Sequence, residues 1–142
     1  MLMDYEQELT TAGGQAVTAN GYGTKNYDQK GAADAAVGEK LNAFYKVAVA
    51  DFNNLTSMDI AIVGDDDGAG TNEVVIATKN VTLANLTKAK GVQRIATLPV
   101  GTRKRFYRMK FTVNGTAPAA GKIVGWLSSG DDDAPANNVF TL

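Results

Sequence analysis

The strongest constraint on the fold is the period of two over residues 106–113, in which apolar residues at 107, 109, 111 and 113 alternate with a second set that includes two basic residues. Aromatic or aliphatic side chains occupy every second position, and Arg108 and Lys110 lie between them. Successive side chains of a β-strand point to opposite faces, so this pattern predicts an antiparallel strand with one buried face. We expect the inward positions to be Tyr107, Met109, Phe111 and Val113.

The same period of two recurs earlier in the chain. Positions 45, 47 and 49 are apolar in one segment, and positions 58, 60 and 62 are apolar in another. Shorter runs rich in Val, Ile and Thr predict further strands. These strands are expected at residues 15–18, 73–78, 92–98 and 123–127, with residues 139–142 as a closing edge. A helix over residues 83–90 stays open, and Gly91 would end it.

The spacing of these segments indicates the fold class. About seven or eight strands at spacings of about 10 to 16 residues favour an antiparallel β-sandwich or jelly roll over alternating α/β units. The chain of 142 residues has no internal repeat and no linker that divides it, which predicts one domain.

The first 40 residues or so differ from the rest, being rich in Gly, Ala, Asn and Gln. Only residues 15–18 and Tyr27 look strand-like there. We therefore expect an extended N-terminal arm over residues 1–14, with one or two short edge strands after it, and a β-sandwich over residues 15–142. A Gly-rich arm is poor at forming a core of its own and is expected to order against a partner.

The composition excludes several kinds of chemistry. The chain has no Cys and no His, so it can form no disulfide, no metal site with sulfur or imidazole ligands and no catalytic triad built on those residues. Its formal net charge of -1 lacks the basic excess of a nucleic-acid binder and gives no general attraction to an anionic membrane. We expect no cofactor, no metal and no enzymatic activity.

The sequence carries no targeting signal that we recognise. Its N-terminus lacks a basic region followed by an apolar run, and no stretch approaches the ~18 apolar residues of a transmembrane helix. We therefore expect a protein that is made and used in a cytoplasm.

Two acidic runs, at residues 65–67 and 131–133, admit two interpretations. Hard oxygen ligands beside Gly68 could hold a weak calcium or sodium ion. The spacing of an EF-hand loop is absent, however, and Asp is common in turns between strands. The plainer interpretation is that both runs are solvated turns.

A basic cluster with interleaved aromatic residues precedes and enters the alternating strand. It comprises Arg103, Lys104, Arg105, Phe106, Tyr107, Arg108 and Lys110. Three interpretations stay open: contact with single-stranded nucleic acid, a surface complementary to an acidic protein, or a solvated strand face. The single tryptophan, Trp126, lies on the face opposite Ile123 and Leu127, where a lone tryptophan is usually core or interface.

Residues 98–113 and 117–123 carry a family resemblance. They read Leu-Pro-x-Gly, basic residues, an aromatic-Arg-apolar strand and Thr-Val, followed by Ala-Gly-Lys-apolar. This pattern resembles the capsid cement (decoration) proteins of tailed bacteriophages, which are small jelly rolls on the outside of the coat shell. The acidic runs at 65–67 and 131–133 depart from that pattern.

The resemblance implies a structural function without catalytic residues. We expect the chain to bind the phage major capsid protein on the outer surface of the virion, after assembly in the host cytoplasm, and to form a homodimer or homotrimer. The coat-binding residues we expect are Arg103, Lys104, Arg105, Phe106 and Arg108, together with the N-terminal arm. The alternative function is a carbohydrate-binding β-sandwich module, and a carboxylate-based hydrolase is a third class.

Overall fold

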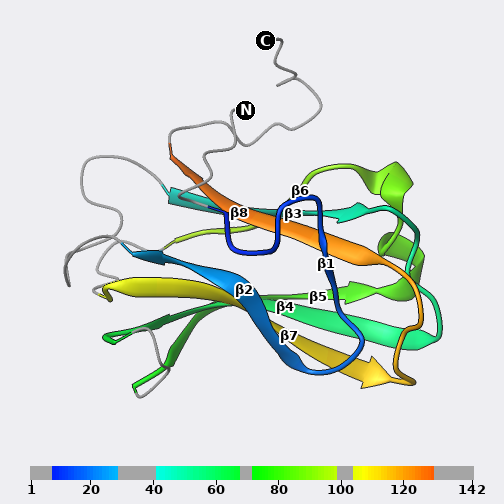
Figure 1. The fold of residues 1–142 in the computed structure, drawn as a ribbon, viewed down its shortest axis with the longest axis horizontal. Coiled ribbons are helices and arrows are strands. Elements are labelled where there is room, and N and C mark those ends of the chain that lie inside the picture. Colours follow the sequence, from blue (N-terminus) through cyan, green and yellow to red (C-terminus); the bar gives the residue numbers. More distant parts are fainter. Residues whose placement is uncertain (1–7, 29–40, 68–71, 99–103, 130–142) are drawn as a thin grey trace, which may run out of the picture.

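A computed structural model describes residues 8–28, 41–67, 72–98 and 104–129 (Figure 1). These residues form an all-β fold with eight strands and two short 3-10 turns. The strands are β1 (Gln15–Ala16), β2 (Gly21–Asp28), β3 (Leu41–Ala48), β4 (Leu55–Asp65), β5 (Val74–Thr82), β6 (Gln93–Thr97), β7 (Phe106–Gly115) and β8 (Lys122–Ser129). The 3-10 turns are η2 (Leu83–Asn85) and η3 (Lys88–Lys90).

The strands pair into two antiparallel sheets of four strands that face each other (Figure 1). One sheet has the order β1-β8-β3-β6, and the other has the order β2-β7-β4-β5. Only β4 and β5 are consecutive neighbours, and every other connection passes between the sheets. This is the strand order of an eight-stranded jelly roll, which confirms the predicted fold class.

The core lies between the two sheets and follows the alternation of the sequence. Tyr107, Met109 and Phe111 of β7 are each at most 1% exposed. Apolar residues of the opposite sheet, such as Ile123 and Leu127, complete the same cluster. The predicted inward positions of β4, residues 58, 60 and 62, are also fully buried.

Two local predictions need correction. Val49 was expected to share the buried face of Tyr45, but it follows the end of β3, has a φ of 70° and is 63% exposed. The possible helix over residues 83–90 is two separate 3-10 turns with the buried Leu86 between them. Across the described ranges, no helix has the length and apolar character to cross a bilayer. The predicted edge at residues 139–142 lies outside the described residues.

Strand β2 was not predicted, apart from Tyr27. Its sequence is Gly-Tyr-Gly-Thr-Lys-Asn-Tyr-Asp, which has few of the β-branched residues typical of strands. It pairs with β7 and is irregular between Tyr22 and Asn26. Tertiary pairing with a strongly patterned strand therefore outweighs weak local propensity.

Residues 8–10, which the sequence analysis placed in the arm, are packed into the sandwich. Glu8, Leu9 and Thr10 are at most 1% exposed. The N–H of Leu9 donates to the carbonyl oxygen of Gly125 at 2.8 Å, and the N–H of Gly125 donates to Oγ1 of Thr10 at 3.0 Å. The inner end of the predicted arm is thus a structural part of the sheet that contains β8.

Trp126 lies on the side of its sheet away from the main core, as the alternation predicted. It stacks on Phe44 with 5.9 Å between ring centroids and forms a second cluster with Phe44 and Val124. Trp126 is only 3% exposed. It therefore offers no open aromatic platform.

Candidate interaction surface on the outer face of one sheet

The outer face of the sheet β2-β7-β4-β5 carries the basic residues singled out in the sequence. Because the alternate residues of β7 fill the core, Arg108 and Lys110 project from the opposite face. Strand β7 lies between β2 and β4, so its outward side chains are flanked by residues of both neighbours. The sheet thereby gathers side chains from distant parts of the chain.

Glu73, directly before β5, is the centre of this face. Its Oε1 accepts a 2.6 Å hydrogen bond from the hydroxyl of Tyr22, and its Oε2 accepts a 3.1 Å bond from Nζ of Lys110. Nη2 of Arg108 lies 3.7 Å from Oε1. Two cations and a phenol therefore share one carboxylate.

These contacts shift the pKa values of the ionisable groups in this cluster. Desolvation is the largest influence on the pKa of Glu73 and raises it, but the hydrogen bonds and charges of Tyr22, Lys110 and Arg108 together bring the pKa below its usual value. The hydrogen bond to Glu73 is the main cause of the raised pKa of Tyr22, and the same carboxylate raises the pKa of Lys110. Glu73 is therefore held ionised and Tyr22 protonated.

Arg108 also forms an ion pair with a buried acid, Asp65. Its Nη2 lies 3.4 Å from Oδ2 of Asp65, which is 1% exposed, and its guanidinium stands 4.2 Å above the ring of Tyr22. Within the described residues its Nε is buried and has no hydrogen-bond partner. A buried carboxylate that loses its cation is costly, by about 3 to 5 kcal/mol in comparable cases, so Arg108 stabilises the fold as well as lining the surface.

Arg105 makes the best-defined ion pair of this face. Its Nε and Nη2 donate to the two carboxylate oxygens of Asp28 at 2.8 and 3.0 Å, which is the bidentate geometry typical of arginine. The hydrogen bond to Asp28 is also the main reason that the pKa of Arg105 is raised. The guanidinium lies 4.9 Å from the ring centroid of Phe106.

The structure thus brings together most of the predicted coat-binding residues. Lys104, Arg105, Phe106 and Arg108 lie on or beside one strand, whereas Arg103 falls outside the described residues. Lys104 pairs with Asp66 at 3.3 Å. The cations Lys104, Arg105, Arg108 and Lys110 are matched by the acids Asp28, Asp65, Asp66 and Glu73. We call these eight residues and Tyr22 the paired-charge face.

Sequence reasoning did not find the acidic half of this face. Asp28 and Arg105 are 77 residues apart, and Tyr22 and Glu73 are 51 apart, so no local motif connects them. Asp65 was read as a turn residue, but it is the last residue of β4 and is buried. The run at residues 131–133 lies outside the described ranges. In the part of the chain that the structure describes, no three acidic residues are grouped so as to hold a metal ion.

Comparisons with known proteins give one family. A search of curated proteins found no match. The model of the phage-associated Bbp16 family matches residues 11–126, a span that runs from just before β1 into β8 and includes the paired-charge face. Since this match covers most of the 142 residues, the chain belongs to the Bbp16 family.

Proposed function

We propose that this protein is a capsid cement protein, which binds the outer surface of a tailed-phage coat shell and stabilises the contacts between capsomers. The observation that carries the proposal is the Bbp16 family match, because it spans almost the whole jelly roll and joins the chain to phage proteins. The resemblance to cement proteins over residues 98–113 and 117–123 falls inside the same span.

The proposed contact surface is the paired-charge face. Its side chains are already held by ion pairs and by the ring of Tyr22, so little conformational entropy remains to be lost on docking. A fixed array of donors and acceptors suits a protein partner that presents a complementary array. Arg and aromatic residues are also common among the residues that dominate binding energy.

The charge balance changes the expected physics of attachment. Four cations opposite four acids leave this face nearly neutral, so it gives little long-range attraction. Attachment should then depend on shape and on exchange of hydrogen bonds, and should weaken only modestly as salt rises. The basic residues without their acidic partners would instead predict attachment that weakens as salt rises.

Self-association is part of the proposal. A closed homodimer or homotrimer would bridge neighbouring capsomers with a single kind of chain, and each further contact would form intramolecularly. Light scattering on the purified protein should give an oligomer mass. A monomer at every accessible concentration would contradict this part of the proposal.

Cosedimentation with empty coat shells tests the function. The shells should be assembled from the major capsid protein of the same phage genome, and the wild-type protein should sediment with them. Failure of the wild-type protein to bind would overturn the cement function. At most a modest loss of attachment on moving from low to high salt would fit the near-neutral face, whereas complete release would not.

A variant pair tests the surface. Arg105→Glu places an acid against Asp28 and should reduce attachment, whereas Lys88→Glu on η3 makes the same charge change away from this face and should not. Reversal of Arg108 is unsuitable, because it would leave the buried Asp65 without its cation. Equal attachment of both variants would place the contact elsewhere.

The carbohydrate-binding alternative has less support. Sugar sites usually present an open aromatic ring, and the one tryptophan is 3% exposed and stacked on Phe44. A glycan array separates the two functions, because a cement protein should give no saturable binding to any glycan on it.

A further inference from the structure

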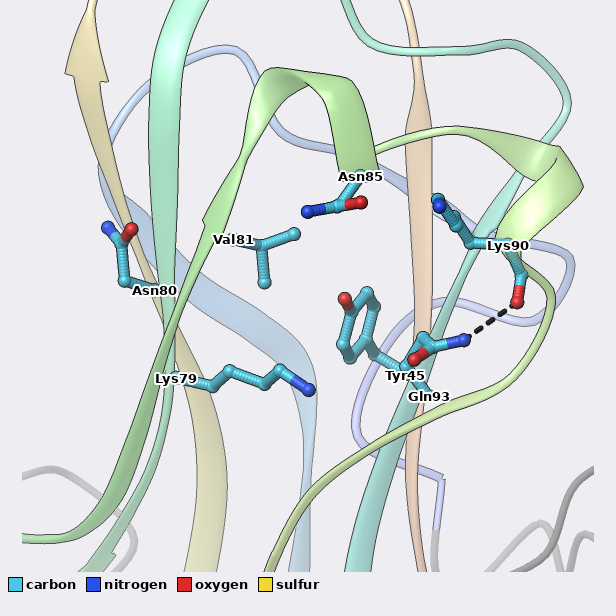
Figure 2. Close-up of a pocket in the computed structure, with 7 residues that line it drawn as sticks. All are labelled: Tyr45, Lys79, Asn80, Val81, Asn85, Lys90 and Gln93. Atoms are coloured by element: carbon cyan, nitrogen blue, oxygen red, sulfur yellow. Dashed lines mark hydrogen bonds between the residues drawn. The ribbon is translucent and has the colours of Figure 1, made fainter.

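A polar cavity opens at the edge of the sandwich, away from the paired-charge face. Strands β5 and β6 are edge strands of the two different sheets, and the cavity of about 240 Å³ lies between them and the turns η2 and η3. Its lining includes Tyr45, Lys79, Val81, Asn85, Lys90 and Gln93 (Figure 2).

The lining carries two lysines and no acid. Within the described residues, neither Lys79 nor Lys90 pairs with a carboxylate, in contrast to the cations of the paired-charge face. Nζ of Lys79 donates to the carbonyl oxygen of Arg94 at 3.2 Å. An ammonium group has three protons, so this bond leaves further donors for a ligand. The cavity is therefore electropositive.

Tyr45 supplies a hydroxyl at the floor of the cavity. The residue is 2% exposed, its ring belongs to the main core, and its hydroxyl points into the cavity (Figure 2). That hydroxyl has no hydrogen-bond partner within the described residues. Burial raises the pKa of Tyr45, which keeps the group protonated as a donor. Because the oxygen of this hydroxyl is not itself buried, a ligand in the cavity can reach it and accept its hydrogen bond.

The turns around the cavity are held in place. Nε2 of Gln93 donates to the carbonyl oxygen of Lys90 at 2.7 Å, which fixes the end of η3 that carries Lys90 (Figure 2). Nδ2 of Asn85 donates to Oγ1 of Thr82 at 3.2 Å. The donors therefore come from elements whose backbone positions are set before a ligand binds, which lowers the entropic cost of binding.

We propose that this cavity binds a small oxyanion, held by the ammonium groups of Lys79 and Lys90 and by the hydroxyl of Tyr45. A cationic ligand would meet two like charges. A neutral sugar would lack an open aromatic face, since Tyr45 presents its hydroxyl edge (Figure 2). A carboxylate on a small organic acid and inorganic phosphate share the required chemistry. The proposal does not depend on attachment to a coat shell.

Titration of the 15N-labelled protein with succinate and, separately, with inorganic phosphate tests the site. Sodium chloride at matched ionic strength is the control. Saturable shifts at the amides of residues 79, 85, 90 and 93 are expected with at least one oxyanion and not with chloride. Saturation with succinate alone identifies a carboxylate ligand, and saturation with phosphate alone identifies a phosphate ligand. Shifts that match the chloride control would overturn the proposal.

Two neighbouring lysines give a matched pair of variants. Lys90→Met should weaken binding at least about tenfold, the loss expected for one charge-assisted hydrogen bond. Lys88→Met, in the same 3-10 turn but outside the lining, should bind like the wild type. Tyr45→Phe removes only the hydroxyl and should bind several-fold more weakly without loss of the fold. Equal affinities for Lys90→Met and Lys88→Met would show that the anion binds elsewhere.

Discussion

The hydroxyl of Tyr22 donates a 2.6 Å hydrogen bond to Oε1 of Glu73, across the outer face of the sheet β2-β7-β4-β5. Tyr22 belongs to β2 at one edge, and Glu73 directly precedes β5 at the other edge. Arg108 and Lys110 of β7 lie beside this link, each with its charged group over the ring of Tyr22 and each paired with Glu73. This hydrogen bond thus links the two edge strands of the sheet, β2 and β5, across β7, which carries the basic residues.

The first prediction concerns that hydrogen bond. Tyr22→Phe removes the hydroxyl but keeps the ring beneath Arg108, so it isolates the link to Glu73. Since Tyr22 is partly exposed, we expect a loss of about 1 kcal/mol in the free energy of unfolding, measured by urea denaturation. Tyr27→Phe on the same strand is the control, because no hydrogen bond of its hydroxyl is present among the described residues. Equal losses would show that the link has no effect on stability.

The second prediction concerns pH. The pKa of Glu73 is lowered in the folded protein, so its contribution to stability is present above the unfolded pKa and is lost as the pH falls through the folded pKa. Glu73→Gln should therefore lower Tm near neutral pH, and the difference from wild type should shrink as the solution is acidified below the ordinary glutamate value of 4.5.

A matched acid provides the control for this experiment. Asp66→Asn removes a carboxylate whose side chain is 47% exposed and whose partner is Lys104, a surface pair of the kind that contributes little. Its Tm should follow that of the wild type at every pH. A difference between Glu73→Gln and wild type that grows on acidification would mean that the sign of the shift is reversed.

The third prediction compares the two faces of β7. Phe111→Ala should cost about 3 to 5 kcal/mol in the free energy of unfolding, because a fully buried ring leaves a cavity. Lys110→Ala should cost much less, since it removes only a partly exposed ion pair with Glu73. Thermal or urea unfolding measures both. Similar costs would indicate that the core is able to collapse around position 111.

The same strand shows how far the sequence determines the fold. The alternation over residues 106–113 places side chains correctly on two faces, because burial on one face fixes the register of a strand. It does not identify the partners across the sheet. Asp28 meets Arg105 only because β2 and β7 are neighbours, and that pairing depends on the topology of the whole jelly roll.

Strand β2 is the clearest element that local patterns miss. Its polar and Gly-rich sequence resembles a loop, and its position follows from pairing with β7. The cavity beside Tyr45 could not be predicted from the sequence either, because its lining comes from β3, β5, β6 and the two 3-10 turns. The residue types in one segment predict which of its own side chains are buried. A site whose lining comes from several strands can be predicted only when the order of the strands in the sheets is known.

The last prediction concerns Gly23 of β2, where the neighbouring chain leaves no room for a side chain. A Cβ on Gly23 would lie 2.1 Å from the carbonyl oxygen of Leu9, whereas a Cβ on Gly21 would meet nothing within 4 Å. The carbonyl of Leu9 also accepts a 3.3 Å hydrogen bond from the N–H of Lys25, so residues 8–10 run against this strand. Any side chain at position 23 must push that segment away.

Gly23→Ala should therefore lower the free energy of unfolding by about 1 to 3 kcal/mol, the usual cost of overpacking, and Gly21→Ala should change it by about 0.5 kcal/mol or less. Urea denaturation of wild type and of the two variants measures these free energies. The comparison is matched, because both variants carry the same substitution on the same strand. The result also bears on the N-terminal arm. If displacing Leu9 destabilises the sandwich, deletion of residues 1–14 will reduce stability as well as any coat contact, because it removes the buried Leu9 and Thr10. Equal stability of the two variants would mean that residues 8–10 separate from β2 at little cost, and the deletion would then report on coat binding alone.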